Sequence, residues 1–212
     1  MFIFHGGKMW LRQLCNANMY RPALRAKRGL MSSQQDSHIV WIDTELTGLD
    51  LDASKILEVA CLVTDSDLNV TSPEFEVIIN QPDSVLNNMD EWCLTHHGQS
   101  GLIKKCQAST IMVTEAEQML LEFLKKYVPK GKCPLAGNTV YMDRFFLSKH
   151  MPKVNEYLHY RIIDVSSIKE VARRWYKDTY SNAPKKHLNH RALADIKESL
   201  QEMIFYKQHI FK

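Results

Sequence analysis

The 212-residue sequence contains no apolar run that approaches the roughly 20 residues needed to cross a bilayer, which excludes a membrane-spanning helix. It contains only five cysteines, an odd number, and no Cys-x-x-Cys pair. This pattern is unlike a disulfide framework or a zinc site, and it indicates a reducing compartment. With 45% hydrophobic and 24% charged residues, the chain has the composition of one soluble globular domain.

Positive charge is scarce outside the N-terminal segment. Residues 1–37 contain six Lys or Arg and one acid, so residues 38–212 keep 21 of the 27 basic residues and 23 of the 24 acidic ones. The main part of the chain is therefore slightly acidic and lacks the basic surface that a long polyanion needs. Any nucleic acid that binds there should occupy a small site.

The N-terminal segment, residues 1–37, is rich in arginine and nearly free of acids, and it lacks the continuous apolar core of a secretory signal. This composition is typical of a mitochondrial transit peptide, and the alternative is a disordered basic tail. Met31 follows the basic block, so a second start there would give a cytosolic form. We therefore expect a leader over 1–37 and a folded domain over 38–212, in mitochondria and, through Met31, also in the cytosol.

Hydrophobic periodicity predicts three strands followed by alternating helices and strands, which indicates an α/β fold with a mixed five-stranded sheet flanked by helices. Two capping boxes, Thr114-x-x-Glu117 and Ser167-x-x-Glu170, predict where two helices begin. The expected strands cover residues 39–45, 56–64, 75–79, 133–137 and 160–165. The longer helices are expected over 114–128, over 143–150, from 167 onward and over 191–208, with short helical pieces within 83–108 and a loop over 178–186.

Two acids at the end of the first strand, Asp43 and Glu45, are two residues apart and therefore project to the same side. Adjacent carboxylates need a cation or a proton between them, and hard oxygen ligands suit Mg²⁺ or Mn²⁺. Two further acids, Asp143 and Asp195, occupy strand–helix junctions, the latter behind His190. Considered alone, Asp143 could instead be an acid that stabilises the N-terminus of its helix through the helix dipole. Asp195 alone could be a surface residue, and His190 alone could be a loop histidine.

Three motifs resemble those of the DEDDh 3′–5′ exonucleases: Asp43-Thr-Glu45-Leu-Thr-Gly-Leu49, Gly137-Asn138 through Asp143-Arg-Phe-Phe146, and His190-Arg-Ala-Leu-Ala-Asp195. Two further stretches narrow the resemblance to the oligoribonuclease family: Asn88-Met-Asp-Glu-Trp92 with His97-Gly-Gln-Ser-Gly101, and His159-Tyr160-Arg161-Ile-Ile-Asp164-Val-Ser166. The resemblance covers nearly all of 38–212 and leaves out the leader, which bacterial members lack and mitochondrial members have. The chain departs from the family pattern at Ala194, where relatives often have an acid, and at Thr139, where they have serine.

This resemblance implies a ribonuclease H-like fold and a 3′–5′ exoribonuclease, a phosphodiester hydrolase that degrades short RNA, especially dinucleotides, to 5′-mononucleotides. The matches to the family's ligands for two divalent ions, Mg²⁺ or Mn²⁺, are Asp43, Glu45, Asp143 and Asp195. Asp43 is expected to contact both ions. His190 matches the general base, a role that suits imidazole near neutral pH.

The resemblance also implies substrate contacts. Leu49 matches an apolar wedge between adjacent bases and Trp92 offers a stacking face, with core packing as the alternative for both. The other matches, to positions that contact the substrate or cap its 5′-phosphate, are His97, Thr139, Tyr160, Arg161 and Ser166. Such a cap would accept a dinucleotide and collide with a longer chain. The family further implies a homodimer in which Tyr160 and Arg161 reach the partner's active site.

Two other functions stay open at the level of the sequence. One is a DEDDh exonuclease acting on DNA or longer RNA, against which the missing basic surface and the segments around Trp92 and Tyr160 weigh. The other is a degenerate exonuclease fold that only binds RNA or a partner, against which the presence of all four acids and His190 weighs.

Overall fold

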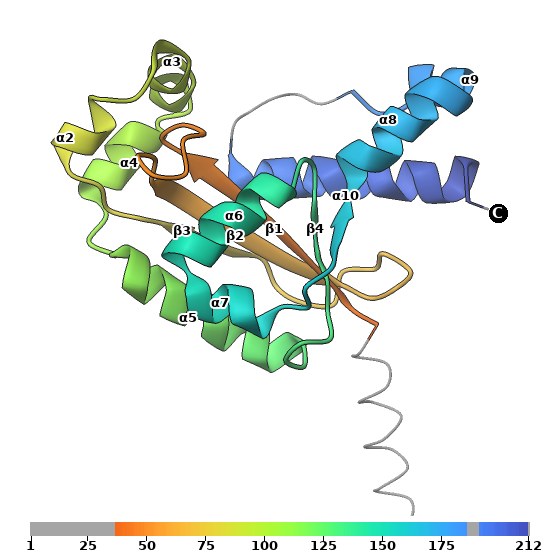
Figure 1. The fold of residues 1–212 in the computed structure, drawn as a ribbon, viewed down its shortest axis with the longest axis horizontal. Coiled ribbons are helices and arrows are strands. Elements are labelled where there is room, and N and C mark those ends of the chain that lie inside the picture. Colours follow the sequence, from red (N-terminus) through yellow and green to blue (C-terminus); the bar gives the residue numbers. More distant parts are fainter. Residues whose placement is uncertain (1–36, 186–190, 212) are drawn as a thin grey trace, which may run out of the picture. The chain divides into compact units, whose positions relative to one another are not determined.

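The computed structural model describes residues 37–185 and 191–211, so the predicted leader lies almost entirely outside the described residues. The described chain forms a mixed five-stranded sheet with strand order β3-β2-β1-β4-β5 and helices on both faces (Figure 1). The fold class predicted from the sequence is therefore confirmed. The strands are β1 (Ile39–Leu46), β2 (Ile56–Thr64), β3 (Phe75–Ile78), β4 (Leu135–Gly137) and β5 (Ile162–Asp164).

The first three strands form the antiparallel half of the sheet, since β1 pairs with β2 and β2 pairs with β3. All nine residues of β2 are buried, which explains why its sequence is a nearly continuous apolar run. β1 also pairs in parallel with β4, and β4 pairs in parallel with β5. The carboxyl ends of β1, β4 and β5 therefore lie at the same edge of the sheet. The first two predicted functional acids, Asp43 and Glu45, lie at this end of β1.

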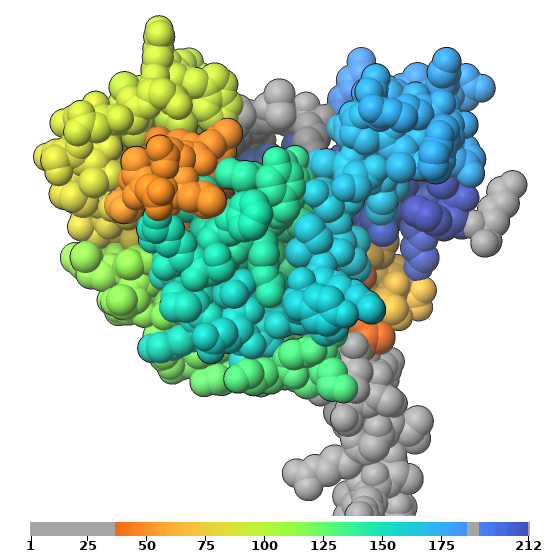
Figure 2. All heavy atoms as spheres, viewed as in Figure 1, coloured from red at the N-terminus to blue at the C-terminus, as the bar shows by residue number. Residues whose placement is uncertain are grey.

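Helices cover both faces of this sheet (Figure 1). Helices α5, α6 and α7 pack on one face and α8 and α10 on the other. In the space-filling view, α6 and α7 form a continuous surface between α2–α4 at one end and α8 with α9 at the other (Figure 2). The bounds are α2 (Asp83–Leu86), α3 (Glu91–Gln99), α4 (Leu102–Ala108), α5 (Val113–Tyr127), α6 (Tyr141–His150), α7 (Pro152–Tyr157), α8 (Val165–Trp175), α9 (Lys177–Ser181) and α10 (Ala192–His209). Among the described helices, none is long and apolar enough to cross a membrane.

The side chains of β1 alternate between two hydrophobic cores. Val40 and Ile42 belong to the core under α5, α6 and α7. Trp41, on the opposite side of the strand, belongs to the core under α8 and α10. By the same alternation, Asp43 and Glu45 continue the α10 side of the strand, and the residue between them faces α6.

The two predicted capping boxes are wrong. α5 begins one residue before Thr114 and has no side-chain cap bond. α8 begins two residues before Ser167, and its cap is the side chain of Asp164, which accepts a hydrogen bond from the Ser166 N–H. In both cases the predicted cap residue lies inside the first helical turn, so it lacks the extended backbone that a capping residue adopts.

Other differences concern short elements. α6 begins at Tyr141 rather than residue 143, and β5 begins at Ile162 rather than residue 160. Part of the loop expected over 178–186 is helix α9, and the six-residue α7 was not expected at all. Elements this short span too few turns for hydrophobic periodicity to define them.

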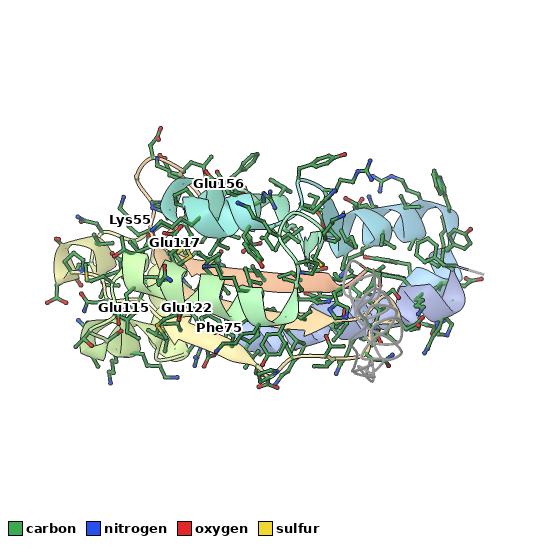
Figure 3. The ribbon with its side chains drawn as sticks, turned by 90° about the horizontal axis from the view of Figure 1, so that it is seen from below. Lys55, Phe75, Glu115, Glu117, Glu122 and Glu156 are labelled. Carbon is green, nitrogen blue, oxygen red and sulfur yellow. The ribbon has the colours of Figure 1, made fainter. Side chains whose placement is uncertain are left out.

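Glu117, predicted as part of a capping box, is buried and serves a different helix. Its Oε1 accepts a 2.6 Å hydrogen bond from the Lys153 N–H in the first turn of α7. Figure 3 shows Glu117 on the side of α5 toward α7, whereas Glu115 and Glu122 lie on the other side. The Glu117 carboxylate therefore ties α5 to α7.

This geometry predicts opposite results for the two residues of the expected capping box. Thr114→Ala should change the free energy of unfolding by less than about 0.5 kcal/mol, because Thr114 makes no cap bond. Glu117→Ala should cost about 1–3 kcal/mol, because the Lys153 N–H loses its buried acceptor. Urea unfolding measures both, with the exposed Glu115→Ala on the same helix as control. A cost for Thr114→Ala that equals that of Glu117→Ala would contradict this assignment.

Candidate active site

Three carboxylates from two elements converge at the carboxyl end of β1. Asp43 and Glu45 lie on the face of β1 turned toward α10, and Asp195 is in the first turn of α10. A carboxylate oxygen from each of the three lies within 4.8 Å of those from the other two. The structure therefore brings together three of the four acids that the sequence predicts as metal ligands.

The fourth acid, Asp143, approaches β1 from the opposite face of the sheet. It is buried in the first turn of α6, and its Oδ1 accepts hydrogen bonds from the Thr44 N–H (2.9 Å) and the Thr44 hydroxyl (2.6 Å). Thr44 lies between Asp43 and Glu45, so its side chain points to the α6 side. Asp143 is outside the group of three, yet it is near enough for its charge to raise the pKa of Glu45.

Two of the four acids, Glu45 and Asp143, hold their protons more tightly than ordinary carboxylic acids. Burial, reinforced by the charge of Asp195 and other nearby acids, raises the pKa of Glu45 to about 8. Burial also raises the pKa of Asp143 to about 7, against the opposing effect of the hydrogen bonds from Thr44. Negative charge concentrated in a poorly hydrated setting explains both shifts.

The chemistry of this donor set fits a divalent cation. Mg²⁺ and Mn²⁺ prefer oxygen ligands, and the three grouped residues offer only carboxylate oxygens. A cation between them would relieve the repulsion that favours the protonated form of Glu45. The predicted general base, His190, lies outside the described residues, so the geometry of the site is defined here by its acids.

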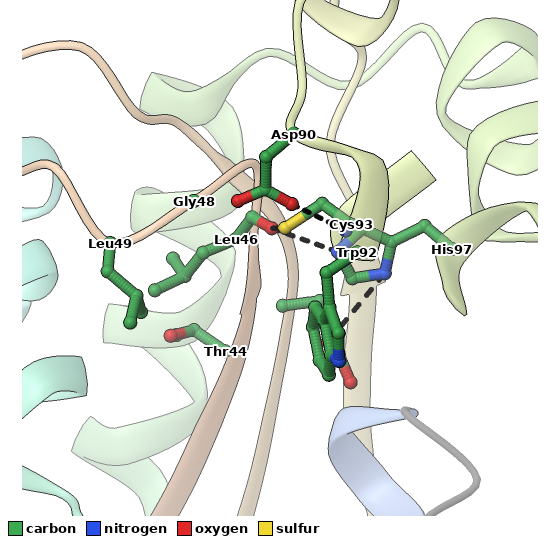
Figure 4. A pocket seen from close by; sticks show the side chains of 9 residues that line it. Thr44, Leu46, Gly48, Leu49, Asp90, Trp92, Cys93 and His97 are labelled. Carbon is green, nitrogen blue, oxygen red and sulfur yellow. Dashed lines mark hydrogen bonds and ion pairs between the residues drawn. The ribbon is translucent and has the colours of Figure 1, made fainter. Parts of the chain in front are cut away.

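A cavity of about 410 Å³ adjoins Glu45. Leu49 and Trp92 stand on opposite sides of it and are 72% and 54% exposed, respectively (Figure 4). Side chains this exposed are not part of a core, which removes core packing as their role. Trp92 stacks on His96 with ring centroids 4.1 Å apart, so its indole presents a supported face.

His97 lines the same cavity but is only 1% exposed. Its Nε2 lies 2.9 Å from the carbonyl oxygen of Leu46, and its Nδ1 lies 3.9 Å from Oε2 of Glu45. A carbonyl oxygen only accepts, so Nε2 is the donor in the first contact. His97 is thus positioned behind Glu45 as well as beside the cavity.

Thr139 and Ser166 lie together just beyond the ends of β4 and β5, with their hydroxyl oxygens 3.1 Å apart. Oδ1 of Asp164 accepts the backbone N–H of both residues, at 3.0 Å from Thr139 and 2.9 Å from Ser166. Thr139 has a φ of 55°, a left-handed conformation that is strained for a β-branched residue. The Asp164 carboxylate therefore holds a strained turn in place and sets the distance between the two hydroxyls.

Tyr160 and Arg161 are separated from these hydroxyls by the length of β5, because they precede the strand and Ser166 follows it. Tyr160 is 73% exposed, and the guanidinium carbon of Arg161 lies 5.3 Å from the centre of its ring, within reach of a cation–π contact. Neither residue lines the cavity beside Glu45. The structure therefore divides the predicted substrate contacts into three groups rather than one.

Two residues that shape the site, Thr44 and Asp164, had no role assigned from the sequence. Thr44 could have been found from strand alternation, because a hydroxyl between two acids must face the opposite helix layer. Asp164 could have been found as a cap, because it follows an apolar strand and precedes a helical segment. Neither signal identifies the partner residue across the sheet, which only the fold supplies.

Comparison with known proteins gives the family. The family model described as Exonuclease matches residues 40–203, a segment that contains all three acidic motifs. The chain is 52% identical over 177 residues to a Drosophila melanogaster protein named probable oligoribonuclease, covering 84% of each chain. It is also 52% identical over 174 residues to the human protein named mitochondrial oligoribonuclease, covering 82% of this chain and 73% of the human one.

A solved structure gives the fold. The zinc-bound complex of Escherichia coli ExoI with single-stranded DNA matches with a TM-score of 0.66 at 14% identity, over 82% of this chain and 41% of that one. An identity this low supports the ribonuclease H-like exonuclease fold alone. The family model and the 52% identity to the fly and human proteins extend over most of the sequence. The chain therefore belongs to the exonuclease family and, within it, to the oligoribonucleases.

Proposed function

We propose that this chain is a 3′–5′ exoribonuclease that hydrolyses short oligoribonucleotides, especially dinucleotides, to 5′-mononucleotides. The observation that supports this most directly is the group of Asp43, Glu45 and Asp195 beside a cavity flanked by Leu49 and Trp92. The three acids suit a divalent cation, and the adjacent cavity offers the exposed indole of Trp92, on which a base can stack. In a chain that is half identical to oligoribonucleases, this combination favours RNA hydrolysis over binding alone.

Asp43, Glu45 and Asp195, with Asp143, would hold two divalent ions, for which Mg²⁺ and Mn²⁺ are the fitting metals. When bound, such ions stabilise charge on the phosphoryl oxygens and help to activate water. The contribution of the protein is to fix its oxygen ligands. Thr44 does this for Asp143 through two hydrogen bonds to one carboxylate oxygen.

His190 would act as the general base toward the attacking water. It precedes Asp195 by five residues, so it comes before α10 in the chain while Asp195 stays in the first turn of that helix. Imidazole suits this role because it accepts and releases protons near neutral pH. His190, before the helix, would then accept the proton of the water, and Asp195, on the helix, would bind the metal ion.

Leu49 and Trp92 would hold the bases. Stacking on an aromatic side chain stabilises a bound strand by roughly 1–3 kcal/mol per base and tolerates any base. The neighbouring hydroxyls of Thr139 and Ser166 would bind the 5′-phosphate of a short substrate, and His97 would line the base cavity. A phosphate held at the end of the site would limit the length of RNA that fits.

We also propose a homodimer in which Tyr160 and Arg161 complete the active site of the partner. Their separation from the cavity of their own chain supports this arrangement, as does the 73% exposure of Tyr160. Arginine suits a phosphate because its planar fork can donate two hydrogen bonds to it at once.

Mitochondria are the proposed location. The mouse, human and bovine relatives at 52% identity are each named mitochondrial oligoribonuclease. The arginine-rich segment 1–37 has the composition of a transit peptide. The internal start at Met31, which would give a cytosolic form, depends on the sequence alone.

The alternative is an exonuclease that acts on DNA or longer RNA. The fold is shared with E. coli ExoI, which was solved with single-stranded DNA. The main part of the chain is slightly acidic, however, and a long strand needs many phosphate contacts.

The length of the preferred RNA tests the function. With Mg²⁺, the full chain should cleave a 5′-phosphorylated dinucleotide faster than a five-nucleotide RNA, and the latter faster than a twenty-nucleotide RNA. The reason is that the site holds two bases and one terminal phosphate. Removal of the 5′-phosphate should slow cleavage of the dinucleotide most. Equal or faster cleavage of the twenty-nucleotide RNA would favour the alternative, and no cleavage with Mg²⁺ or Mn²⁺ would leave a binding protein.

The metal ligands are tested by removing one charge. Asp195→Asn should reduce turnover to below roughly 1% of wild type, a loss of about 3 kcal/mol or more in transition-state stabilisation, because a cation ligand is lost. Asp178→Asn, an exposed carboxylate on α9, is the matched control and should keep full activity. Circular dichroism should show the same fold for both. Substantial turnover by Asp195→Asn would remove this residue from the ligand set.

The raised pKa of Glu45 predicts how metal-free protein responds to pH. Between about pH 4.5 and 8 the folded chain keeps a proton on Glu45 that the unfolded chain releases, so stability should fall as pH rises through this window. The slope contributed by this group should reach about 1.4 kcal/mol per pH unit. Saturating Mg²⁺ should flatten the profile because cations bind the ionised form.

Urea unfolding from pH 5 to 8, in EDTA and in Mg²⁺, measures this response. Glu45→Gln should make the metal-free profile less steep and leave the contribution of Asp143, whose raised pKa acts in the same direction. The exposed Glu122→Gln on α5 should leave the profile unchanged. A metal-free stability that rises with pH over this window would show that Glu45 is ionised in the folded chain without a cation.

A further inference from the structure

An ion pair between a half-buried arginine and a fully buried carboxylate joins α10 to the sheet next to the acid cluster. Arg191, the residue at the N-cap of α10, donates from its Nε to Oε2 of Glu58 at 3.1 Å and from its Nη2 to Oε1 at 2.7 Å. Glu58 is on β2 and has no exposed surface. Two parallel hydrogen bonds between planar groups fix orientation as well as distance, which a single charge contact cannot do.

Glu58 is directly opposite Glu45 in the ladder between β1 and β2. Residues that pair in this way project to the same face of a sheet, so Glu58 faces α10 beside the acid cluster. The Arg191 guanidinium also contacts Glu76 on β3, with Nη2 3.1 Å from its Oε1. One arginine from the start of α10 is therefore attached to two strands of the sheet.

The backbone continues this connection to the acid cluster. The carbonyl oxygen of Arg191 accepts the Asp195 N–H at 3.0 Å, which closes the first turn of α10. Oε2 of Glu58 also lies 3.4 Å from the Ala192 nitrogen and accepts its N–H, one of the donors that a helix start leaves without an intrahelical partner. Glu58 thus holds both the side chain and the first amide of the turn that bears Asp195.

We infer that Glu58 and Arg191 are positioning residues of the metal centre, which fix the first turn of α10 on β2 so that Asp195 reaches Asp43 and Glu45. This inference rests on the proposed function, because the three acids must bind a cation for their relative positions to matter. Arg191 also follows His190 directly in the sequence. The same anchor therefore fixes the chain one residue after the proposed base.

Stability alone is a weak reason for such a pair. Replacing a buried ion pair by well-packed apolar residues often leaves stability unchanged or improves it, because the desolvation of two charges offsets their attraction. Orientation is what an apolar pair cannot reproduce. Lysine at position 191 would keep the charge and lose the fork.

The same helix offers a matched control. Lys197 on α10 forms an ion pair with Glu74, with Nζ and Oε1 2.8 Å apart, and both side chains are about half exposed. This pair also links α10 to the segment before β3, but it lies at the surface and forms a single contact. Its removal should leave the first turn of α10 in place.

Mn²⁺ binding by the full-length protein tests the inference without relying on activity. Electron paramagnetic resonance of free Mn²⁺ gives the dissociation constant for wild type, Arg191→Lys, the double variant Glu58→Leu/Arg191→Leu and the double control Glu74→Leu/Lys197→Leu. We expect the dissociation constant to rise about 10-fold in Arg191→Lys and about 10- to 100-fold in Glu58→Leu/Arg191→Leu, the range for residues that orient metal ligands. The control should match wild type.

Urea unfolding of the same variants separates positioning from stability. The double variant Glu58→Leu/Arg191→Leu should unfold at a denaturant midpoint close to that of wild type while binding Mn²⁺ more weakly. Wild-type affinity in both Arg191→Lys and this double variant would overturn the inference. The inference would also be overturned if the affinity for Mn²⁺ fell in proportion to the free energy of unfolding in every variant, including the control. Failure of wild type to bind Mn²⁺ would instead reject the proposed function.

Discussion

The alternation of side chains along β1 is the constraint on which the rest of the site depends. Because neighbouring residues of a strand face opposite sides, Asp43 and Glu45 meet α10, while Thr44 meets α6. The central position of β1 in the sheet gives each of these helices access to the same strand end. A shift of β1 by one residue would turn both acids away from Asp195, so the pairing of β1 with β2 and β4 protects the chemistry as well as the fold.

Charge is arranged differently on the two sides of this site. Burial, reinforced by the charges of Asp195 and other nearby acids, raises the pKa of Glu45 in the acid cluster to about 8. One strand away, Glu58 is buried completely and is matched by the fork of Arg191. Under the proposed function, the crowded acids would form the binding centre, and the paired charges of Glu58 and Arg191 would support it. The hydrophobic cores on both faces of the sheet stabilise the fold and offset the unfavourable repulsion among the clustered acids.

The strands and the acids could be predicted from the sequence because both signals are local. An apolar run and a spacing of two residues need no knowledge of distant partners, and the resemblance to a family supplied the roles. The capping boxes were wrong because their residues serve distant groups or none. Glu117 is taken by α7, 36 residues away, and Asp164 replaces Ser167 as the cap of α8 while also holding Thr139. The roles of these residues depend on contacts with distant parts of the chain, which a short sequence motif cannot indicate.

The strained turn at Thr139 has a consequence for how a small substrate would bind under the proposed function. Its left-handed backbone and its bond to Asp164 are already present in the folded chain, so the hydroxyls of Thr139 and Ser166 are preorganised. The conformational entropy of this turn is lost when the chain folds, so binding of a ligand does not have to order it again. A dinucleotide has few atoms with which to offset such a loss. Under the proposed function, this rigid turn would let a very short ligand be held by a few contacts.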